Sequence, residues 1–332
     1  MRHRHTYYLI AAVLLGLILM NGCTKKTRIG FLMDQSETGR WAKDKEYFIK
    51  NVRDMGGEVV FRASEQDADK QVKLAEEILK EKVDALVVIP ADLNVAAKIV
   101  KLAHKKNVPV ISYDRIIKNC NLDFYISFDN VLVGEMQAKF LTTLCPKGNY
   151  ALLGGAVTDN NSFLLRIGQL NVIDPMVQRG DINLVYDQYV KAWLPSEGYR
   201  LMKECLKKNK HIDAVLASND QLAEGATKAL MEAGVDPLPF ITGQDADPEA
   251  CRRIMAGTQS MTVYKPIEAI AKEAAEITMQ IARDGTIPRT YLSVNNGKIQ
   301  VPALLLKPML VNKETINLTV NADKYMEELE EK

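Results

Sequence analysis

The 332-residue sequence has little of several residue types on which common functional classes depend. Its 5 cysteines include no CxxC pair and its 4 histidines are scattered, so both a zinc scaffold and a disulfide-dense mini-domain are disfavoured. Lysines and arginines number 43 against 42 acidic residues, and a formal net charge of +1 provides no basic field for nonspecific nucleic-acid binding. We therefore expect neither a bound metal nor a nucleic-acid partner. Hydrophobic residues at 47% and charged residues at 26% are ordinary for a globular protein and argue against wholesale disorder.

Residues 1–22 have the features of an export signal. Arg2 and Arg4 precede an apolar stretch, 7–20, that is too short to span a bilayer comfortably. The small residue directly before Cys23 resembles the lipobox of bacterial lipoproteins, in which the cysteine is acylated and becomes the new N-terminus. We therefore expect Cys23 to be a lipidation site. The alternatives are a signal peptide cleaved at another position and an uncleaved anchor.

The remainder of the chain predicts an exported, soluble protein. Loss of residues 1–22 removes two arginines and no acid, which leaves a net charge of −1. After Cys23 no run of 18 apolar residues follows. We expect the mature chain in the periplasm or on the outer face of the cell membrane, attached to the membrane through the lipid at Cys23.

From residue 27 onward, short apolar runs alternate with segments of helical periodicity. Continuous apolar runs such as 85–89 are typical of parallel strands buried on both faces, whereas Val72, Ala75 and Leu79 share one helix face. The first array of strands is expected at 28–33, 58–62, 85–89 and 108–113, and the second at 150–153, 184–186, 214–217 and 240–242. Helices are expected at 41–55, 95–104, 162–177, 195–207, 222–232 and 248–255. Two such arrays without a low-complexity linker predict an α/β fold of two doubly wound parallel-sheet lobes packed across a cleft.

Polar residues follow the apolar runs, which is where ligands bind in open α/β sheets. These residues are Asp34, Asp114, Arg115, Asn160, Asn161, Trp193, Asn219, Asp220, Gln244, Asp245 and Lys265. Carboxylates accept hydrogen bonds, Arg and Lys donate them and amides do both, so the mixture suits a neutral polyhydroxyl ligand. A buried hydroxyl left unpaired costs about 1–3 kcal/mol, which makes such pairing selective. Trp41 and Trp193 are the only tryptophans, and one from each lobe is expected to stack on a sugar ring.

Other roles are open for several of these residues. Asp114 and Arg115 could instead form an exposed ion pair with no role in binding. The two tryptophans could instead serve only to pack against the surface of a lobe. Asp247 before Pro248 predicts a helix N-cap and is left out of the site, and Asp220 is a candidate cap for the helix that starts near residue 222.

Two further features are judged structural. Gly154-Gly155 lacks the rest of a GxGxxG or Walker pattern, so a close backbone approach or a tight turn is expected there rather than a phosphate loop. The four cysteines after Cys23 leave disulfides and free buried thiols equally open. They are Cys120, Cys145, Cys205 and Cys251.

Several short motifs occur in an order and spacing that match a known family. They are Tyr113-Asp114-Arg115, Asp123–Asn130, Gly154-Gly155, Asp159-Asn160-Asn161, Trp193-Leu194-Pro195, Ala217–Asp220, Gly243–Asp247, Ala256–Gln259 and Met261–Pro266. Over nearly all of 27–316 the chain resembles the periplasmic D-xylose-binding proteins of sugar ABC importers, within the type I, ribose-binding-like fold.

The resemblance implies a set of nine sugar-contacting positions. They are Arg40, Trp41, Asp114, Arg115, Asn161, Trp193, Asn219, Asp245 and Lys265. In the family pattern Arg40 donates to the sugar, while Asp114 and Arg115 grip vicinal hydroxyls. Residues 34–39 are less charged than the family segment, which bears on the contacts of this first loop. The resemblance further implies D-xylose as ligand, ABC permease subunits as partners and no cofactor.

The resemblance also implies three hinge crossovers, near 130–134, 263–265 and 289–296. The N-terminal lobe would comprise 27–132 plus 265–289, and the C-terminal lobe 133–264 plus 290–320. The amphipathic helix 267–281 would return to the N-terminal lobe. Sugar that contacts both lobes would shift the population toward a closed form, which a membrane permease then reads.

Other functions share parts of this pattern. A sugar sensor would present the same closed form to a membrane histidine kinase or chemoreceptor. A glycosidase using Asp114 and Asp245 would lack a general acid, because Arg115 and Lys265 are expected to keep the carboxylates ionised. A repressor of the same fold needs an N-terminal helix-turn-helix where the export signal stands. We therefore expect a transport-linked binding protein and no enzyme.

Overall fold

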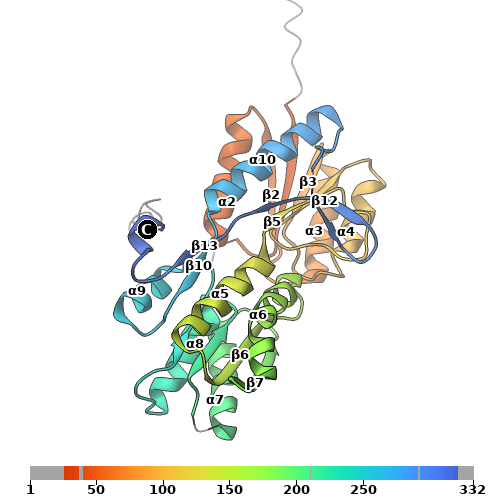
Figure 1. The fold of residues 1–332 in the computed structure, drawn as a ribbon. Coiled ribbons are helices and arrows are strands. Elements are labelled where there is room, and N and C mark those ends of the chain that lie inside the picture. The colour runs from red at the N-terminus through yellow and green to blue at the C-terminus, as the bar shows by residue number, and fades with distance from the viewer. Residues whose placement is uncertain (1–25, 37–39, 210, 291, 321–332) are drawn as a thin grey trace, which may run out of the picture.

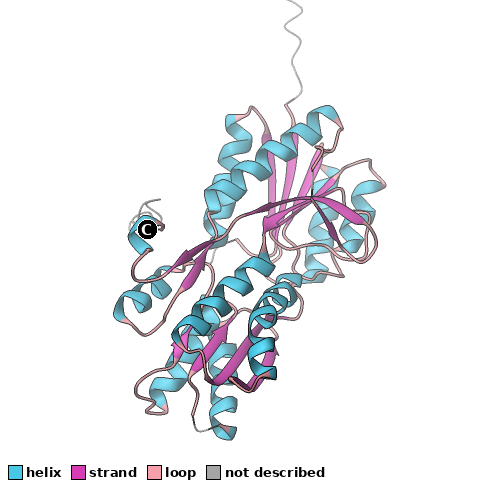
Figure 2. Cartoon of the chain, viewed as in Figure 1, coloured by secondary structure: helices cyan, strands magenta, loops and turns pink. Residues whose placement is uncertain are grey.

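The computed structural model describes residues 26–36, 40–209, 211–290 and 292–320, which form two α/β lobes, one above the other in Figure 1. Figure 2 shows a separate group of strands at the centre of each lobe. The expected export signal, 1–22, and the expected lipidation site, Cys23, lie outside the described residues. In the described part of the chain, none of the helices combines the length and apolar character that a bilayer span requires.

The N-terminal lobe is built on a seven-stranded sheet in the order β11-β12-β5-β4-β3-β1-β2. Its strands are β1 (Arg28–Met33), β2 (Glu58–Ala63), β3 (Ala85–Val88), β4 (Val110–Tyr113), β5 (Phe124–Phe128), β11 (Ser293–Asn295) and β12 (Gln300–Leu306). All neighbouring pairs are parallel except β11 with β12 at one edge. This order, with later strands added on both sides of β1, confirms the predicted doubly wound fold.

Helices cover both faces of this sheet. They are α2 (Arg40–Asp54) and α10 (Ile267–Asp284) on one face, and α3 (Ala68–Lys80) and α4 (Ala97–His104) on the other. Successive residues of β1 alternate between the two cores, so that Phe31 packs with α2 and α10 while Leu32 packs with α3 and α4. Burial on both faces explains why these strands are continuously apolar in sequence.

The C-terminal lobe has a four-stranded parallel sheet in the order β7-β6-β8-β9. Its strands are β6 (Gly148–Ala156), β7 (Ile182–Val190), β8 (Ala214–Ala217) and β9 (Phe240–Ile241). Its helices are α5 (Asn130–Leu144), α6 (Asn160–Gln178), α7 (Pro195–Lys208), α8 (Asp220–Glu232) and α9 (Pro248–Ala256). Helices α5 and α6 approach closely at two glycines: a Cβ on Gly134 would lie 2.0 Å from the Leu165 carbonyl oxygen, and one on Gly168 would lie 2.0 Å from that of Val131.

Three connections join the two lobes. The chain leaves the first sheet after β5, returns between β10 (Thr262–Tyr264) and α10, and crosses again at 307–308, between β12 and β13 (Met309–Val311). Strands β10 and β13 pair in an antiparallel ribbon beside the C-terminal lobe, and a short 3-10 helix, Ile316–Leu318, follows.

The third connection corrects the sequence-based assignment of residues 290–320 to the C-terminal lobe, with a crossover near 289–296. Strand β12 instead pairs in parallel with β5, from Ala303 opposite Tyr125 to Leu306 opposite Phe128. This pairing buries Val301 and Ala303 in the core that also contains α3 and α4. The pairing satisfies the backbone hydrogen-bonding groups of β5 and buries these side chains, and both effects favour placing β12 in the first sheet. Residues 293–306 therefore belong to the N-terminal lobe.

Candidate functional site

The loops at the carboxyl ends of both sheets meet around one cavity of about 60 Å³. All nine residues singled out from the sequence line it: Arg40, Trp41, Asp114, Arg115, Asn161, Trp193, Asn219, Asp245 and Lys265. Five further lining residues are not among these nine: Gln35, Asp159, Gln221, Gln244 and Asp247. Of these, Gln244 was among the polar residues expected at strand ends. Beside this cavity lies a larger opening of about 720 Å³ between the lobes. The residues that border both spaces are Gln35, Arg115, Trp193, Gln221 and Asp247.

Strand ends account for this convergence. Asp114 follows β4, Asn161 follows β6, Trp193 follows β7, Asn219 follows β8 and Lys265 follows β10. Because strands of a parallel sheet end at the same edge, the residues after β4 and those after β6, β7 and β8 are gathered at the rims of their respective sheets. Lys265 reaches the site from β10 of the separate antiparallel ribbon. The two rims face each other, so the site is assembled from both lobes.

Arg40 is held in place by a buried carboxylate on its own helix. Its Nε and Nη2 donate to the two oxygens of Asp44, at 2.9 and 3.1 Å, and the Tyr113 hydroxyl donates to the same carboxylate. Burial raises the pKa of Asp44, and the charge of Arg40 only partly offsets this effect. With two nitrogens fixed, Nη1 of Arg40 is directed to the cavity side, 3.1 Å from Asp114 Oδ2 and 3.7 Å from Asp245 Oδ1.

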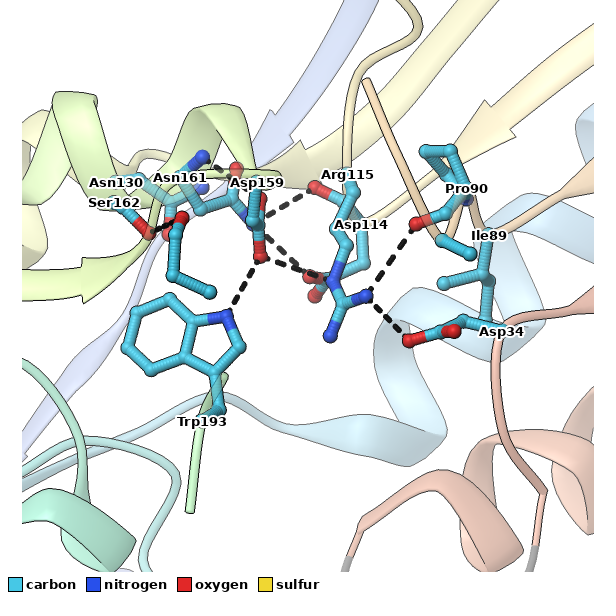
Figure 3. A network of polar contacts seen from close by, with 12 residues as sticks. Asp34, Ile89, Pro90, Asp114, Arg115, Asn130, Asp159, Asn161, Ser162 and Trp193 are labelled. Atoms are coloured by element: carbon cyan, nitrogen blue, oxygen red, sulfur yellow. Dashed lines mark hydrogen bonds and ion pairs between the residues drawn. The ribbon is translucent and has the colours of Figure 1, made fainter. Parts of the chain in front are cut away.

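Arg115 is braced from both lobes. Its Nη1 donates to Asp34 Oδ2 at 2.7 Å, and its Nε lies 2.9 Å from Oδ2 of Asp159 on the opposite lobe, as Figure 3 shows. The guanidinium carbon lies 5.1 Å from the ring centroid of Trp41, and that of Arg40 lies 5.0 Å from the same ring. Trp41 therefore supports two cations as well as lining the cavity.

Asp114 has a left-handed backbone, with φ of 60°. Its carbonyl oxygen accepts hydrogen bonds from the Tyr125 hydroxyl, the Ser127 hydroxyl and Asn161 Nδ2, at 3.0, 2.6 and 3.2 Å. These donors hold a conformation that is uncommon outside glycine, and Asp tolerates it better than most residues.

The charge state of Asp114 follows from its neighbours. Burial by itself raises the pKa of Asp114, but Lys265, Arg40 and Arg115 together outweigh burial and hold that pKa below its usual value. The carboxylate is thus ionised at neutral pH and acts as an acceptor, which agrees with the expectation that it is no general acid.

The C-terminal lobe presents its site residues at helix N-termini. Asp159 caps α6 by accepting from the Asn161 backbone N–H at 2.9 Å, and Asn219 caps α8 by accepting from Leu222 N–H at 3.0 Å. This finding corrects the proposal that Asp220 is the cap. Asp220 instead is fully buried and holds the neighbouring loop, because its carboxylate accepts from the backbone N–H of Asp247 at 2.9 Å.

Trp193 packs closely against a glycine and is held by a hydrogen bond from its ring nitrogen. A Cβ on Gly155 would lie 1.9 Å from the indole ring, so the absent side chain makes room for Trp193. The expected close backbone approach at Gly154-Gly155 is therefore real. The indole Nε1 donates to Asp159 Oδ2 at 3.2 Å, which sets the direction of the ring (Figure 3).

The loop after β9 carries two carboxylates, Asp245 and Asp247, and both line the cavity. Lys265 Nζ lies 2.9 Å from Asp245 Oδ1, and Asp245 has a positive φ of 97°. Asp247 occupies the N-cap position of α9 but makes no capping hydrogen bond with its side chain, so that part of the expectation for it is wrong. Burial, followed by repulsion from Asp245, raises the pKa of Asp247 to about 7.

Several buried polar atoms around the cavity lack a hydrogen-bond partner. They are Asp34 Oδ1, Asn161 Oδ1, Gln244 Oε1, Arg40 Nη1, Asp114 Oδ2 and Asp245 Oδ1. Nη1 of Arg40 lies within ion-pair distance of Asp114 Oδ2 and of Asp245 Oδ1, yet neither contact forms an aligned hydrogen bond. Five acceptors and one donor of this kind match a ligand rich in hydroxyl groups, since each hydroxyl both donates and accepts.

Metal chemistry and disulfide chemistry have little support in the described ranges. No group of three or more His, Cys, Asp or Glu side chains there has the geometry to hold a metal ion. The four cysteines whose pairing the sequence left open are free thiols, with Cys145 half-buried and the other three buried.

Comparison with known proteins places the chain among binding proteins. Residues 29–286 match the periplasmic binding protein domain. The D-xylose-binding periplasmic protein of Escherichia coli K12 is 42% identical over 92% of this chain and 93% of its own length, and that of Haemophilus influenzae is 41% identical over 91% of each. A solved structure of an ABC transporter solute binding protein from Clostridium phytofermentans with bound β-D-glucose superposes with a TM-score of 0.84, at 26% identity, over 90% of this chain and 98% of that one.

These relatives are binding proteins, which confirms the expected non-enzymatic class and the type I fold. The match extends across both lobes and includes every motif quoted from the sequence up to residue 266. The chain therefore belongs to the periplasmic binding protein family, with D-xylose-binding periplasmic proteins among its relatives.

Proposed function

We propose that this protein captures D-xylose outside the cytoplasm by closing two lobes around it and delivers the sugar to an ABC import permease. The observation that carries the proposal is the cavity wall itself, where residues from both lobes line one space. Relatives at 41–42% identity carry D-xylose binding in their names, and the nine matched side chains are the ones drawn together here.

The size and polarity of the site favour a pentose. A cavity of about 60 Å³ enclosed by charged side chains has little space for the extra hydroxymethyl group of a hexose. D-ribose differs from D-xylose in the direction of one hydroxyl. An epimer of this kind leaves a buried acceptor unpaired, at a cost of about 1–3 kcal/mol. The middle of that range, about 2 kcal/mol, corresponds to roughly 30-fold selectivity against D-ribose.

Closure would be a hinge motion at the three connections between the lobes. We place these hinges near 130–134, 263–265 and 307–308, and accordingly assign 27–132, 265–289 and 293–306 to the N-terminal lobe. Arg40, Asp114 and Arg115 would hold the sugar from this lobe, while Asn161, Trp193 and Asn219 would hold it from the other. Full contact with the sugar exists only in the closed form, so binding shifts the population toward closure.

We propose that the mature protein is tethered to the membrane by a lipid on Cys23. Support comes from the basic and apolar character of residues 1–22 and from the glycine that directly precedes the cysteine. Metabolic labelling with a palmitate analogue tests this point, and retention of label by a Cys23→Ser variant would contradict it.

Calorimetry with D-xylose, D-ribose, D-glucose and D-galactose tests the ligand assignment. D-xylose should bind, and the other three should bind at least tenfold more weakly. Equal or tighter binding of any of the three would overturn the assignment.

The alternative is a sensor that presents the closed form to a membrane histidine kinase or chemoreceptor. Fold and ligand are the same in both cases, so the partner decides between them. D-xylose-dependent co-purification with permease subunits supports transport, and co-purification with a kinase or chemoreceptor supports sensing.

A further inference from the structure

Asp159 lines the cavity without being one of the nine expected sugar ligands, and it contacts three of them. Its Oδ1 accepts from the backbone N–H of Asn161 at 2.9 Å. Its Oδ2 is 3.2 Å from Nε1 of Trp193 and 2.9 Å from Nε of Arg115. Figure 3 shows the carboxylate standing between the indole and the guanidinium.

The two partners of Oδ2 come from different lobes. Trp193 follows β7 in the same lobe as Asp159, whereas Arg115 follows β4 in the opposite lobe. The bond to Trp193 can therefore persist in an open form, but the contact with Arg115 exists only when the lobes approach. Arg115 is already held by Asp34 at 2.7 Å within its own lobe, so Asp159 supplies its second fixed point.

Burial makes these contacts strong enough to direct side chains. Asp159 and Arg115 are 5% and 7% exposed, so solvent weakens their attraction little. Among the described residues the indole makes no other hydrogen bond, and its remaining support is packing, which includes the close approach to Gly155. Without an acceptor at Asp159, the direction of the indole would rest on packing alone.

We propose that Asp159 is a positioning residue of the binding site, which orients the stacking face of Trp193 at all times and locks Arg115 in place when the lobes close. This inference rests on the proposed sugar-binding function and adds a residue to it. Asp159 has no assigned contact with the sugar and acts through its two neighbours.

The substitution Asp159→Asn separates this role from helix capping. Asparagine is as good an N-cap as aspartate, so its side-chain oxygen can still accept from the Asn161 N–H. The other position then carries an NH₂ group, which cannot accept from the indole or the guanidinium. The same change at Asp67, which caps α3 by accepting from the Lys70 N–H at 2.8 Å, is the matched control because that residue lines neither space between the lobes.

Three measurements are made on the whole protein. The first records the two indole N–H signals by ¹⁵N NMR without sugar, assigned through Trp41→Phe and Trp193→Phe variants. The second is the dissociation constant for D-xylose by calorimetry, and the third is the thermal midpoint. For Asp159→Asn we expect an upfield shift of the Trp193 indole signal, a 10- to 100-fold weaker affinity and a midpoint near that of Asp67→Asn.

An unmoved Trp193 indole signal, or an affinity within twofold of the unaltered protein, would overturn the positioning role. A second result would also overturn the positioning role. If Asp159→Asn lowered the thermal midpoint well beyond the effect of Asp67→Asn but retained its affinity for D-xylose at low temperature, Asp159 would serve as a helix cap alone. Failure of the proposed function is a separate result: the unaltered protein would then bind no D-xylose, while the sugar-free indole signal would still decide whether Asp159 orients Trp193.

Discussion

The two lobes build their halves of the site by different physical means. The N-terminal lobe presents charged side chains that are braced by other buried charges, as Arg40 is by Asp44 and Arg115 is by Asp34. The C-terminal lobe presents residues at the starts of helices, where Asp159 and Asn219 also serve as N-caps.

This difference between the lobes shows where the stability of the fold and the affinity for the ligand depend on the same residue. In the N-terminal lobe the supporting residues lie behind the ligands, so damage to a support leaves a buried charge uncompensated. In the C-terminal lobe one side chain has two tasks, and a substitution that preserves the cap can separate them. The helix N-termini also direct partial positive charge toward the cavity, which balances the carboxylates that line it.

The largest effect is expected at the support of Arg40. Replacement Asp44→Ala removes the partner of a buried guanidinium and should lower the free energy of unfolding by about 3–5 kcal/mol. Urea denaturation measures this change. The matched control is on the same helix, where Lys50 and Asp54 form an exposed pair with the same spacing, 2.9 Å apart. Asp54→Ala should cost less than about 0.5 kcal/mol, and equal losses in the two variants would refute the distinction between buried and exposed supports.

The second effect concerns binding rather than folding. It compares two expected sugar ligands of the C-terminal lobe, Trp193 after β7 and Asp245 after β9. Trp193→Ala and Asp245→Ala should each weaken D-xylose binding by about 30-fold or more, since hot-spot side chains in desolvated sites contribute about 2 kcal/mol or more. Calorimetry at a temperature where circular dichroism shows both variants folded provides the measurement. Unchanged affinity in both would show that the pocket has been misplaced.

A smaller effect separates the two tasks of Asn219. Its Oδ1 caps α8, and its Nδ2 has no partner among the described residues. Asn219→Ala should lower the free energy of unfolding by about 1 kcal/mol and weaken binding, whereas Asn219→Ser should weaken binding but retain the cap. Thermal melts and calorimetry on both variants are needed. Loss of stability in the serine variant equal to that in the alanine variant would refute the dual role.

The smallest effect is the pH dependence contributed by Asp247. Because the folded-state pKa of this carboxyl is raised to about 7, the folded state binds more protons than the unfolded state between about pH 4 and pH 7. Its contribution to stability is therefore lost as pH rises through that window. Asp247→Asn should raise the thermal midpoint by a few degrees at pH 8 and leave it nearly unchanged at pH 4. The charged groups near it are Asp245, Arg253, Glu224 and Arg40, with Asp220 on the adjacent helix. A larger gain at pH 4 than at pH 8 would contradict the sign.

The sequence predicted the alternating α/β organisation because buried parallel strands are continuously apolar, as 85–89 is. It also predicted that nine residues meet at one place, because each follows a strand or matches a family motif. Strand β5 and helix α5 had no periodicity-based assignment. The buried residues of helix α5 share one face, but Asn130, Gly134 and Gln137 on that face are not apolar, so the sequence shows no continuous apolar stripe there.

Two kinds of information were absent from the local pattern. The place of β12 depends on pairing with β5, more than 170 positions earlier in the chain, and such partners leave no mark on nearby residues. The support of Arg40 by Asp44 and Tyr113 likewise depends on distant parts of the fold, although a carboxylate four residues after an arginine on one helix face was a readable signal. Asp159 was read as part of a motif, and its link to Trp193 and Arg115 required coordinates.

The most direct test of the central claim is a crystal structure of the protein with D-xylose. The account expects the sugar ring between Trp41 and Trp193. Its hydroxyl groups should be bound by Asp114 and Arg115 from the N-terminal lobe and by Asn161 and Asp245 from the C-terminal lobe. A sugar bound on one lobe alone, or outside the cavity that these residues enclose, would contradict it.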